Sequence, residues 1–122
     1  MSNQYFSKYH LWVQPISDGS YNVGISAHAQ QMLGDIVFVE PPNVGQRVQA
    51  EHACGIVESV KTASDLHAPV SGTVIAVNPD VTSNPELLDD GPEQHWIFRI
   101  KPDSPEDIGT LMDRASYEAF LA

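Results

Sequence analysis

The expected fold is decided by the stretch Glu58-Ser59-Val60-Lys61-Thr62-Ala63-Ser64-Asp65, which is followed closely by Ala68-Pro69-Val70-Ser71-Gly72. Alternating apolar residues on both sides of Lys61 predict two strands, at about 54–60 and 65–70. Only a tight connection is left between them, so we expect a β-hairpin with Lys61 at or beside its tip. An amine on a rigid hairpin is accessible to a modifying enzyme. The ordinary alternative is a solvated lysine, or one paired with Glu58 or Asp65.

Further strands are predicted around this hairpin by short apolar runs between turn residues, at about 11–13, 21–25, 36–39, 74–77 and 96–100. The first two face each other across the polar turn 17–20. Ser26 and Gly34 have the positions of the N-cap and the terminator of a short helix, and the strand that follows this helix is expected to be buried. The residues 78–95 are expected to form a long polar loop.

An internal similarity and the C-terminal segment complete the expected architecture. Segments 44–48 and 70–74 have similar apolar and glycine spacing on the two sides of Lys61, which suggests two related halves folded about it. Ser104-Pro105 predicts a helix start with Ser104 as the cap, and Asp113 can begin a second short helix. The pattern predicts a mainly β sandwich or partly open barrel in a single domain, 1–122, with a core of about 10–101 and a helical segment of about 105–121.

The composition restricts the classes of partner. Sixteen acidic residues against six basic ones give the 122-residue chain a formal charge of −10. This charge disfavours nucleic acid and anionic membranes and favours partners with basic surfaces. The sequence has no apolar run of transmembrane length, and its first ten residues lack the features of a signal or transit peptide. We therefore expect a cytoplasmic protein.

Motifs of catalysis are missing from the sequence. It contains no G-x-S-x-G elbow, P-loop or dinucleotide glycine fingerprint. Its five histidines are scattered singly, without the spacing of a metal site, and the consecutive Asp89 and Asp90 do not converge on one substrate. Cys54, the only cysteine, lies in an apolar stretch that predicts a buried, unreactive thiol. We expect neither an enzyme nor a metal site.

The stretch around Lys61 resembles the lipoylation segment of the H-protein of the glycine cleavage system. Similar residues extend over nearly the whole chain and include Val23-Gly24-Ile25, His28-Ala29-Gln30, Leu33-Gly34-Asp35-Ile36-Val37-Phe38-Val39, Asn84-Pro85-Glu86-Leu87 and Trp96-Ile97. The resemblance implies a lipoyl-domain-like barrel-sandwich hybrid of two antiparallel sheets, with a short internal helix and C-terminal helices. It also implies lipoic acid in amide linkage to Lys61, in a segment that an attaching enzyme recognises through Glu58, Ser59, Val60 and Asp65.

By the same resemblance the protein is a carrier in glycine cleavage and not an enzyme. The lipoyl group takes the aminomethyl group left by glycine decarboxylase (P-protein). Aminomethyltransferase (T-protein) then removes ammonia and passes the one-carbon unit to tetrahydrofolate, and dihydrolipoamide dehydrogenase (L-protein) reoxidises the dithiol. A lipoate-attaching enzyme is the fourth expected partner. We expect a monomer, because all of these partners need access to one small surface.

One position departs from the family pattern. The family has His-Glu-Trp near its first strand, where the acid helps to hold the amino group of the loaded arm, whereas this chain has His10-Leu11-Trp12. The candidate arm pocket consists of His10, Leu11 and Asp65, and an apolar Leu11 removes from it a favourable partner for a charged amine. An H-protein-like lipoyl carrier for another client, a lipoate relay or a sulfur-oxidation carrier, is therefore an alternative. An unmodified interaction module is the alternative from a different class.

Overall fold

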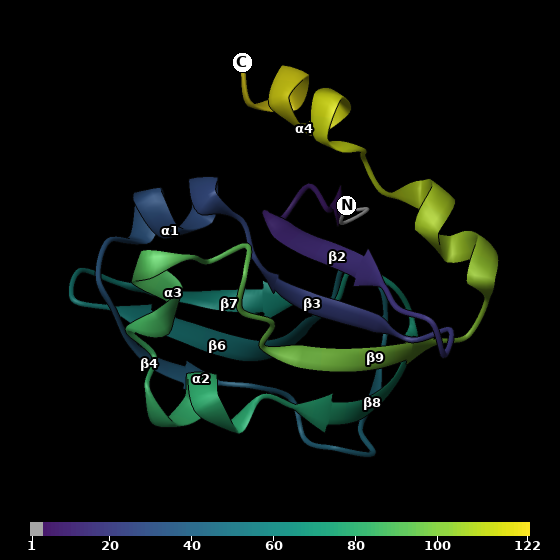
Figure 1. Ribbon diagram of the computed structural model, residues 1–122, viewed down its shortest axis with the longest axis horizontal. Helices are drawn as coiled ribbons and strands as arrows, with labels where there is room; N and C mark the ends of the chain where they lie inside the picture. Colours follow the sequence, from purple (N-terminus) through teal and green to yellow (C-terminus); the bar gives the residue numbers. More distant parts are fainter. Residues whose placement is uncertain (1–3) are drawn as a thin grey trace.

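The strands form two antiparallel sheets in the computed structural model, which describes residues 4–122 (Figure 1). The larger sheet has the order β1-β2-β3-β9-β8-β5, formed by Tyr5–Phe6, Leu11–Pro15, Tyr21–Ile25, Phe98–Pro102, Gly72–Val77 and Arg47–Val48. The smaller sheet has the order β4-β6-β7, formed by Ile36–Glu40, Ala53–Ser59 and Ala63–His67. The predicted mainly β class with two antiparallel sheets is confirmed.

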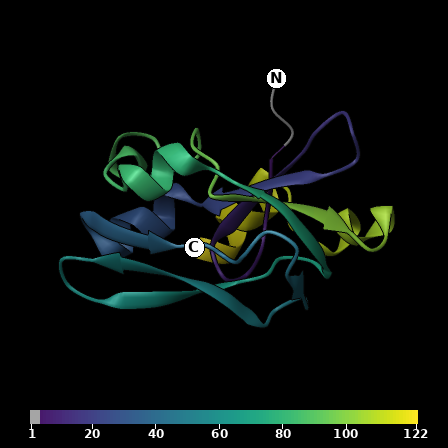
Figure 2. The same ribbon diagram turned by 90° about the horizontal axis from the view of Figure 1, so that it is seen from below.

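The hydrophobic core lies between the two sheets, which form separate layers in Figure 2. Side chains alternate between the faces of a strand, so each sheet directs every second residue inward. Val23 and Phe98 face each other across β3 and β9 and are fully buried. Val57 and Leu66 contribute buried side chains from the smaller sheet. The core therefore packs the two strands of the lysine hairpin, β6 and β7, against the larger sheet.

The C-terminal segment forms a second, smaller core with the beginning of the chain. A 3₁₀ helix, Pro105–Thr110, leads to α4, Arg114–Leu121 (Figure 1). The ring of Tyr117 stacks on that of Phe6 with 4.4 Å between centroids, and Trp12 is buried in the same cluster. Asp113 caps α4 as predicted, because its carboxylate accepts from the backbone N–H of Ser116 at 2.8 Å.

The helix start predicted at Ser104-Pro105 is confirmed, but the predicted side-chain cap is wrong. Ser104 makes no side-chain capping bond to the 3₁₀ helix, and its hydroxyl bonds the carboxylate of Glu106 instead. The Oγ of Ser104 is turned toward this carboxylate, so it does not accept from the backbone N–H groups of the 3₁₀ helix.

The segment 78–95 is not an extended polar loop. It contains α2, Pro79–Ser83, which is capped by the side chain of Asn78, and α3, Leu87–Asp90. Helices of four or five residues are too short to show the 3.6-residue periodicity by which helices are recognised in sequence. Leu88 is fully buried, so the segment packs on the body of the protein.

Three predicted strands have different limits or environments. The second strand of the lysine hairpin, β7, spans Ala63–His67 and not 65–70, because the turn takes only the residues after Ser59 up to Thr62. The last strand begins at Phe98, after Trp96 and Ile97. β4 was expected to be buried, yet Val37 and Phe38 are 54% and 46% exposed, because β4 is an edge strand and its ladder is irregular between Ile36 and Phe38.

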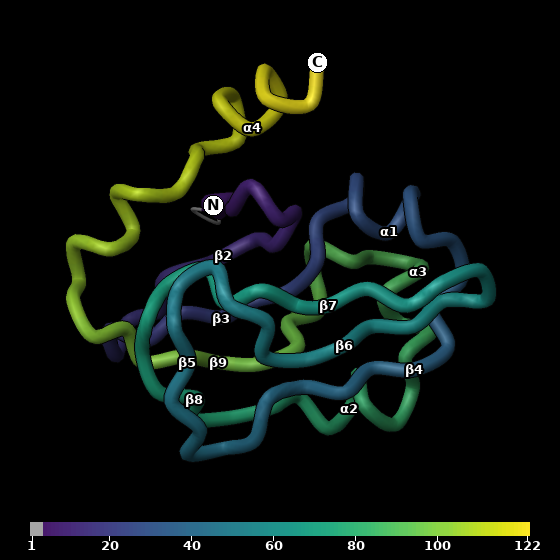
Figure 3. The backbone as a smooth tube through the Cα atoms, turned by 180° about the vertical axis from the view of Figure 1, so that it is seen from behind, coloured from purple at the N-terminus to yellow at the C-terminus, as the bar shows by residue number. Residues whose placement is uncertain are grey.

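The internal helix and the two segments that flank Lys61 lie at opposite ends of the lysine hairpin. Helix α1, Ala27–Leu33, begins at Ser26 and ends at Gly34, as predicted. The two similar segments around Lys61 pair with each other, since Arg47 lies opposite Thr73 and Val48 opposite Gly72. The β6–β7 hairpin runs from this pairing to the other end of the molecule, beside α1 (Figure 3).

Candidate modification site

Lys61 lies in the exposed turn between β6 and β7, as predicted. The side chain of Ser59 holds this turn from the inside. Its Oγ accepts from the backbone N–H groups of Lys61 at 3.2 Å and Thr62 at 3.1 Å. The backbone N–H of Ser59 donates to the carbonyl of Thr62 at 2.8 Å, and Ser59 is only 8% exposed. The tip is therefore a defined turn that presents the lysine outward.

The tip is also attached to the body of the protein. The backbone N–H of Val60 donates to the carbonyl of Asp35 at 3.0 Å. Asp35 belongs to residues 34–36, which we call the α1–β4 corner. Val60 itself is 66% exposed, so only its backbone is used in this contact. The hydrogen bond fixes the direction of the hairpin tip relative to α1.

The amine of Lys61 makes no salt bridge within the described residues 4–122. The ion pairs found there use Lys8, Arg47 and Arg114. Pairing of Lys61 with Glu58 or Asp65 is therefore not observed. An accessible amine without an ion partner is suited to acylation by an activated carboxylic acid, which would convert it to an uncharged amide.

The flanking acids share one face of the smaller sheet. Glu58 lies opposite Ala63 and Asp65 opposite Ile56, and their sequence neighbours Val57 and Leu66 are buried. Alternation along a strand therefore places both carboxylates on the outer face of the hairpin. Ser59 points inward and shapes the turn. Recognition by an attaching enzyme through Glu58, Ser59, Val60 and Asp65 stays a prediction.

The candidate arm pocket is not brought together on one surface. Leu11 is 2% exposed and packs in the core between the sheets, in the same cluster as Leu66. Asp65 precedes Leu66 on β7 and therefore faces the opposite way. The assumption that Leu11 lines a cleft for the arm is not supported by its position, because an arm on the outer face cannot reach a buried leucine. A shared role of His10, Leu11 and Asp65 stays a prediction.

His10 belongs to a different cluster, under the C-terminal helix. Its Nδ1 lies 2.8 Å from the hydroxyl of Tyr117, which in turn lies 2.8 Å from the hydroxyl of Ser26. The rings of His10 and His28 are 4.8 Å apart between centroids. Burial, and to a lesser degree the charge of His28, lower the pKa of His10. The hydroxyl of Tyr117 therefore ties α4 both to His10 and to Ser26, the cap of α1.

Gly34 is a site residue that sequence reasoning treated only as a helix terminator. A Cβ atom at Gly34 would lie 3.2 Å from Cε of Lys61. The lysine stem thus lies over the backbone of a residue 27 positions earlier in the chain. The sequence contains the glycine, but nothing in its local pattern shows which side chain crosses it.

Cys54 is half-buried rather than fully buried, and its thiol is not activated. Burial raises the pKa of the Cys54 thiol to about 11, so the thiol stays protonated at neutral pH. This agrees with the unreactive thiol expected from the sequence. Among residues 4–122, no three His, Cys, Asp or Glu side chains are grouped so that they could hold a metal ion. Within the same range, the helices are all too short or too polar to cross a membrane.

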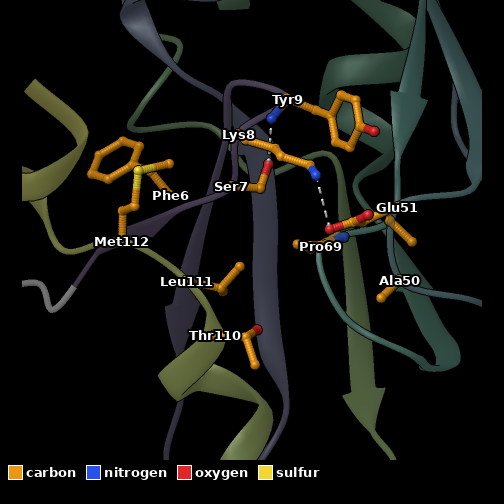
Figure 4. Close-up of a pocket in the computed structure, with 11 residues that line it drawn as sticks. Phe6, Ser7, Lys8, Tyr9, Ala50, Glu51, Pro69, Thr110, Leu111 and Met112 are labelled. Carbon is orange, nitrogen blue, oxygen red and sulfur yellow. Dashed lines mark hydrogen bonds and ion pairs between the residues drawn. The ribbon is translucent and has the colours of Figure 1, made fainter. Parts of the chain in front are cut away.

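A cavity of about 280 Å³ lies away from Lys61 (Figure 4). Its walls include Glu51 just before β6 and Pro69 just after β7, which mark the end of the hairpin opposite to the tip. Lys8 reaches across to Glu51, with 3.4 Å between Nζ and Oε2. The cavity is therefore separate from the modification site.

Comparisons with known proteins match almost the whole chain. A family described as glycine cleavage H-protein matches residues 4–122. The chain is 50% identical over 116 residues to glycine cleavage system H protein 2 of Pseudomonas putida. This match covers 95% of this chain and 91% of the relative. The chain is 48% identical over 117 residues to the glycine cleavage system H protein of Cronobacter sakazakii, with the same coverage.

The fold has a close counterpart among solved structures. The crystal structure of a glycine cleavage system H protein from Mycobacterium marinum superposes with a TM-score of 0.89 at 33% sequence identity. The match covers 99% of this chain and 98% of that one. The similarity thus includes the terminal segments as well as the two sheets.

Proposed function

Because the chain belongs to the glycine cleavage H-protein family, whose members are lipoyl carriers and not catalysts of their own, we propose that it carries lipoic acid in amide linkage to Lys61. The observation that supports this position is the tip of the β6–β7 hairpin. Lys61 is exposed there, free of ion pairs among residues 4–122, and held on a turn that Ser59 organises. An acyl group can be attached without disturbing the core.

The residues around Lys61 fit a covalently tethered group. When attached, the lipoyl group supplies thiol–disulfide exchange and carries the aminomethyl group between enzymes. The protein contributes a rigid platform, because the hydroxyl of Ser59 and the carbonyl of Asp35 hold the tip from two sides. Only the lysine side chain and its attached group need to enter a partner enzyme, while the sheets stay unchanged.

The partners are the enzymes of the glycine cleavage system. We propose glycine decarboxylase, the aminomethyltransferase, dihydrolipoamide dehydrogenase and a lipoate-attaching enzyme as the individual clients of Lys61. Glu58 and Asp65 lie on the outer face of the hairpin that carries the lysine, and the net charge of −10 favours partners with basic surfaces. We further propose a monomer, which leaves this face open, and the cytoplasm as the compartment, in line with the bacterial relatives.

The attachment is tested by the intact mass of the full chain produced in a lipoylating host. We expect a mass increase of one lipoyl group, and peptide mapping should locate it at Lys61. A protein that stays unmodified in the presence of a competent attaching enzyme would contradict the proposal. A lipoyl group found on Lys8 or Lys101 would contradict the assignment to Lys61 alone.

Leu11 does not support a different client. Its side chain is 2% exposed and fills the core opposite Ile25, so a packing role accounts for an apolar residue at this position. The alternative of another lipoyl client therefore loses the observation that suggested it.

Replacing Leu11 by glutamate is expected to destabilise the protein. Leu11→Glu and Leu11→Gln both place polar atoms in the core, which should lower the free energy of unfolding by roughly 1–3 kcal/mol. At pH 7 the glutamate should cost more than the glutamine, because burial disfavours its charged form and raises its pKa. Below about pH 4 the carboxyl of the glutamate is protonated in both the folded and the unfolded state, so burial no longer has a charge to penalise. The difference in stability between the two variants should therefore vanish there. Urea unfolding at both pH values measures this.

The two variants also test the arm pocket. If Leu11→Glu were as stable as the parent protein at pH 7 and improved glycine–bicarbonate exchange, position 11 would have to open to the arm. The core placement of Leu11 would then be wrong.

A further inference from the structure

We propose that Gly34 is a positioning residue for Lys61, because its bare backbone forms a seat on which the lysine stem lies. A Cβ atom on Gly34 would be 3.2 Å from Cε and 3.8 Å from Nζ of Lys61. An ordinary van der Waals contact of a Cβ atom begins at about 3.4 Å. A Cβ atom at position 34 would therefore approach the stem more closely than an ordinary contact allows. Since Cε belongs to a flexible side chain, a Cβ there would displace the stem rather than the sheets.

The seat is fixed within the body of the protein. The backbone N–H of Gly34 donates to the carbonyl of Gln30 at 2.8 Å and closes the last turn of α1. The carboxylate of Asp89, on α3, accepts from the backbone N–H of Ile36 at 3.0 Å and from Nε2 of Gln30 at 3.2 Å. Asp89 thereby holds one residue before Gly34 and one residue after it, which fixes the α1–β4 corner.

The hairpin tip is tied to the same corner. The hydrogen bond from Val60 to the carbonyl of Asp35 sets the distance between the backbone of the tip and Gly34. The lysine stem extends from this fixed tip to Gly34. A fixed seat next to a fixed tip therefore favours one direction of the stem over the many that a solvated lysine would sample.

The charge of the unmodified amine favours the seat as well. The last carbonyls of a helix carry partial negative charge and attract a cation. Helix α1 has no basic residue in its own last turn. Lys61 brings a positive charge to this end of the helix from another part of the chain, since its Nζ would be 3.8 Å from a Cβ on Gly34, which follows the last helical residue.

The consequence for the carrier rests on the proposed attachment of lipoate to Lys61. A seated stem presents the amine to the attaching enzyme in one orientation, which reduces the search for a reactive geometry. The seat itself exists before any modification, so it can be tested separately.

The test compares Gly34→Ala with Gly45→Ala in the unmodified full chain. Both glycines have positive φ angles, +85° and +90°, so an alanine is strained at either position. Only Gly34 faces Lys61, whereas a Cβ on Gly45 meets nothing within 4 Å. In the parent protein and in Gly45→Ala, we expect a nuclear Overhauser effect between Hα of residue 34 and Hε of Lys61, with restricted motion of the ε-methylene. Gly34→Ala should lose both.

A second measurement follows lipoylation kinetics with the attaching enzyme. Gly34→Ala should lower kcat/KM several-fold relative to Gly45→Ala. The proposed seat would be overturned if the parent protein showed no Overhauser effect, or if the ε-methylene motion in Gly34→Ala were unchanged. Neither measurement depends on lipoylation. If Gly34→Ala failed to fold, the parent spectrum alone would decide. A parent protein that shows the effect but never accepts lipoate would refute the proposed function and leave the seat intact.

Discussion

Lys61→Ala is expected to abolish lipoylation and all transfer of the aminomethyl group while the fold remains. The amide requires the lysine amine, and the described part of the chain offers no second lysine on this hairpin. Lys61 is exposed and lies outside both cores, so the free energy of unfolding should change by no more than about 0.5 kcal/mol. Intact mass, glycine–bicarbonate exchange with the partner enzymes and urea unfolding measure the three quantities.

Two further variants control this experiment. Lys61→Arg keeps the long stem and the positive charge but should not be acylated, so it should be as inactive as the alanine variant. Lys101→Ala removes another exposed lysine that makes no ion pair among residues 4–122, and it should keep full activity. Residual exchange by Lys61→Ala would show that a different residue carries the arm. A large loss of stability would show that Lys61 has a structural role.

Gly72→Ala should have the largest effect on stability. A Cβ atom at this position would clash with the carbonyl oxygen of Lys101 and would lie 3.0 Å from Cα of Pro102. Both atoms belong to the backbone of β9, with which Gly72 pairs. Backbone atoms in a ladder cannot turn aside as a side chain can, so β8 and β9 must separate locally. We expect a loss of roughly 2–4 kcal/mol in the free energy of unfolding, measured in urea.

Gly109→Ala is the matched control for this substitution. A Cβ on Gly109 meets nothing within 4 Å, so the same chemical change should leave stability within about 0.5 kcal/mol of the parent protein. If Gly72→Ala were equally neutral, the close approach of β8 to β9 at Lys101 would be wrong. The prediction would also explain why a glycine ends the segment Ala68-Pro69-Val70-Ser71-Gly72.

Local signals were sufficient for much of the fold. The turn after β2, the cap of α1 at Ser26 and the start of α4 at Asp113 each depend on a few adjacent residues, and each was predicted from them. The lysine hairpin was predicted in the same way, although the limits of β7 were shifted. Short helices such as α2 and α3 were missed because one turn of helix produces no periodic pattern.

The sequence by itself determined the mainly β class and the place of Lys61 at a hairpin tip, because these depend on neighbouring residues. It also determined the family, and with it the two-sheet arrangement, because similar residues extend over nearly the whole chain. Only the tertiary structure decided that Leu11 is buried and faces away from Asp65, and that Gly34 lies under the lysine stem. Such relations join residues far apart in the chain. They follow from how the two sheets pack and which strand faces point inward, and alternation along one strand cannot specify which partner its side chains will meet.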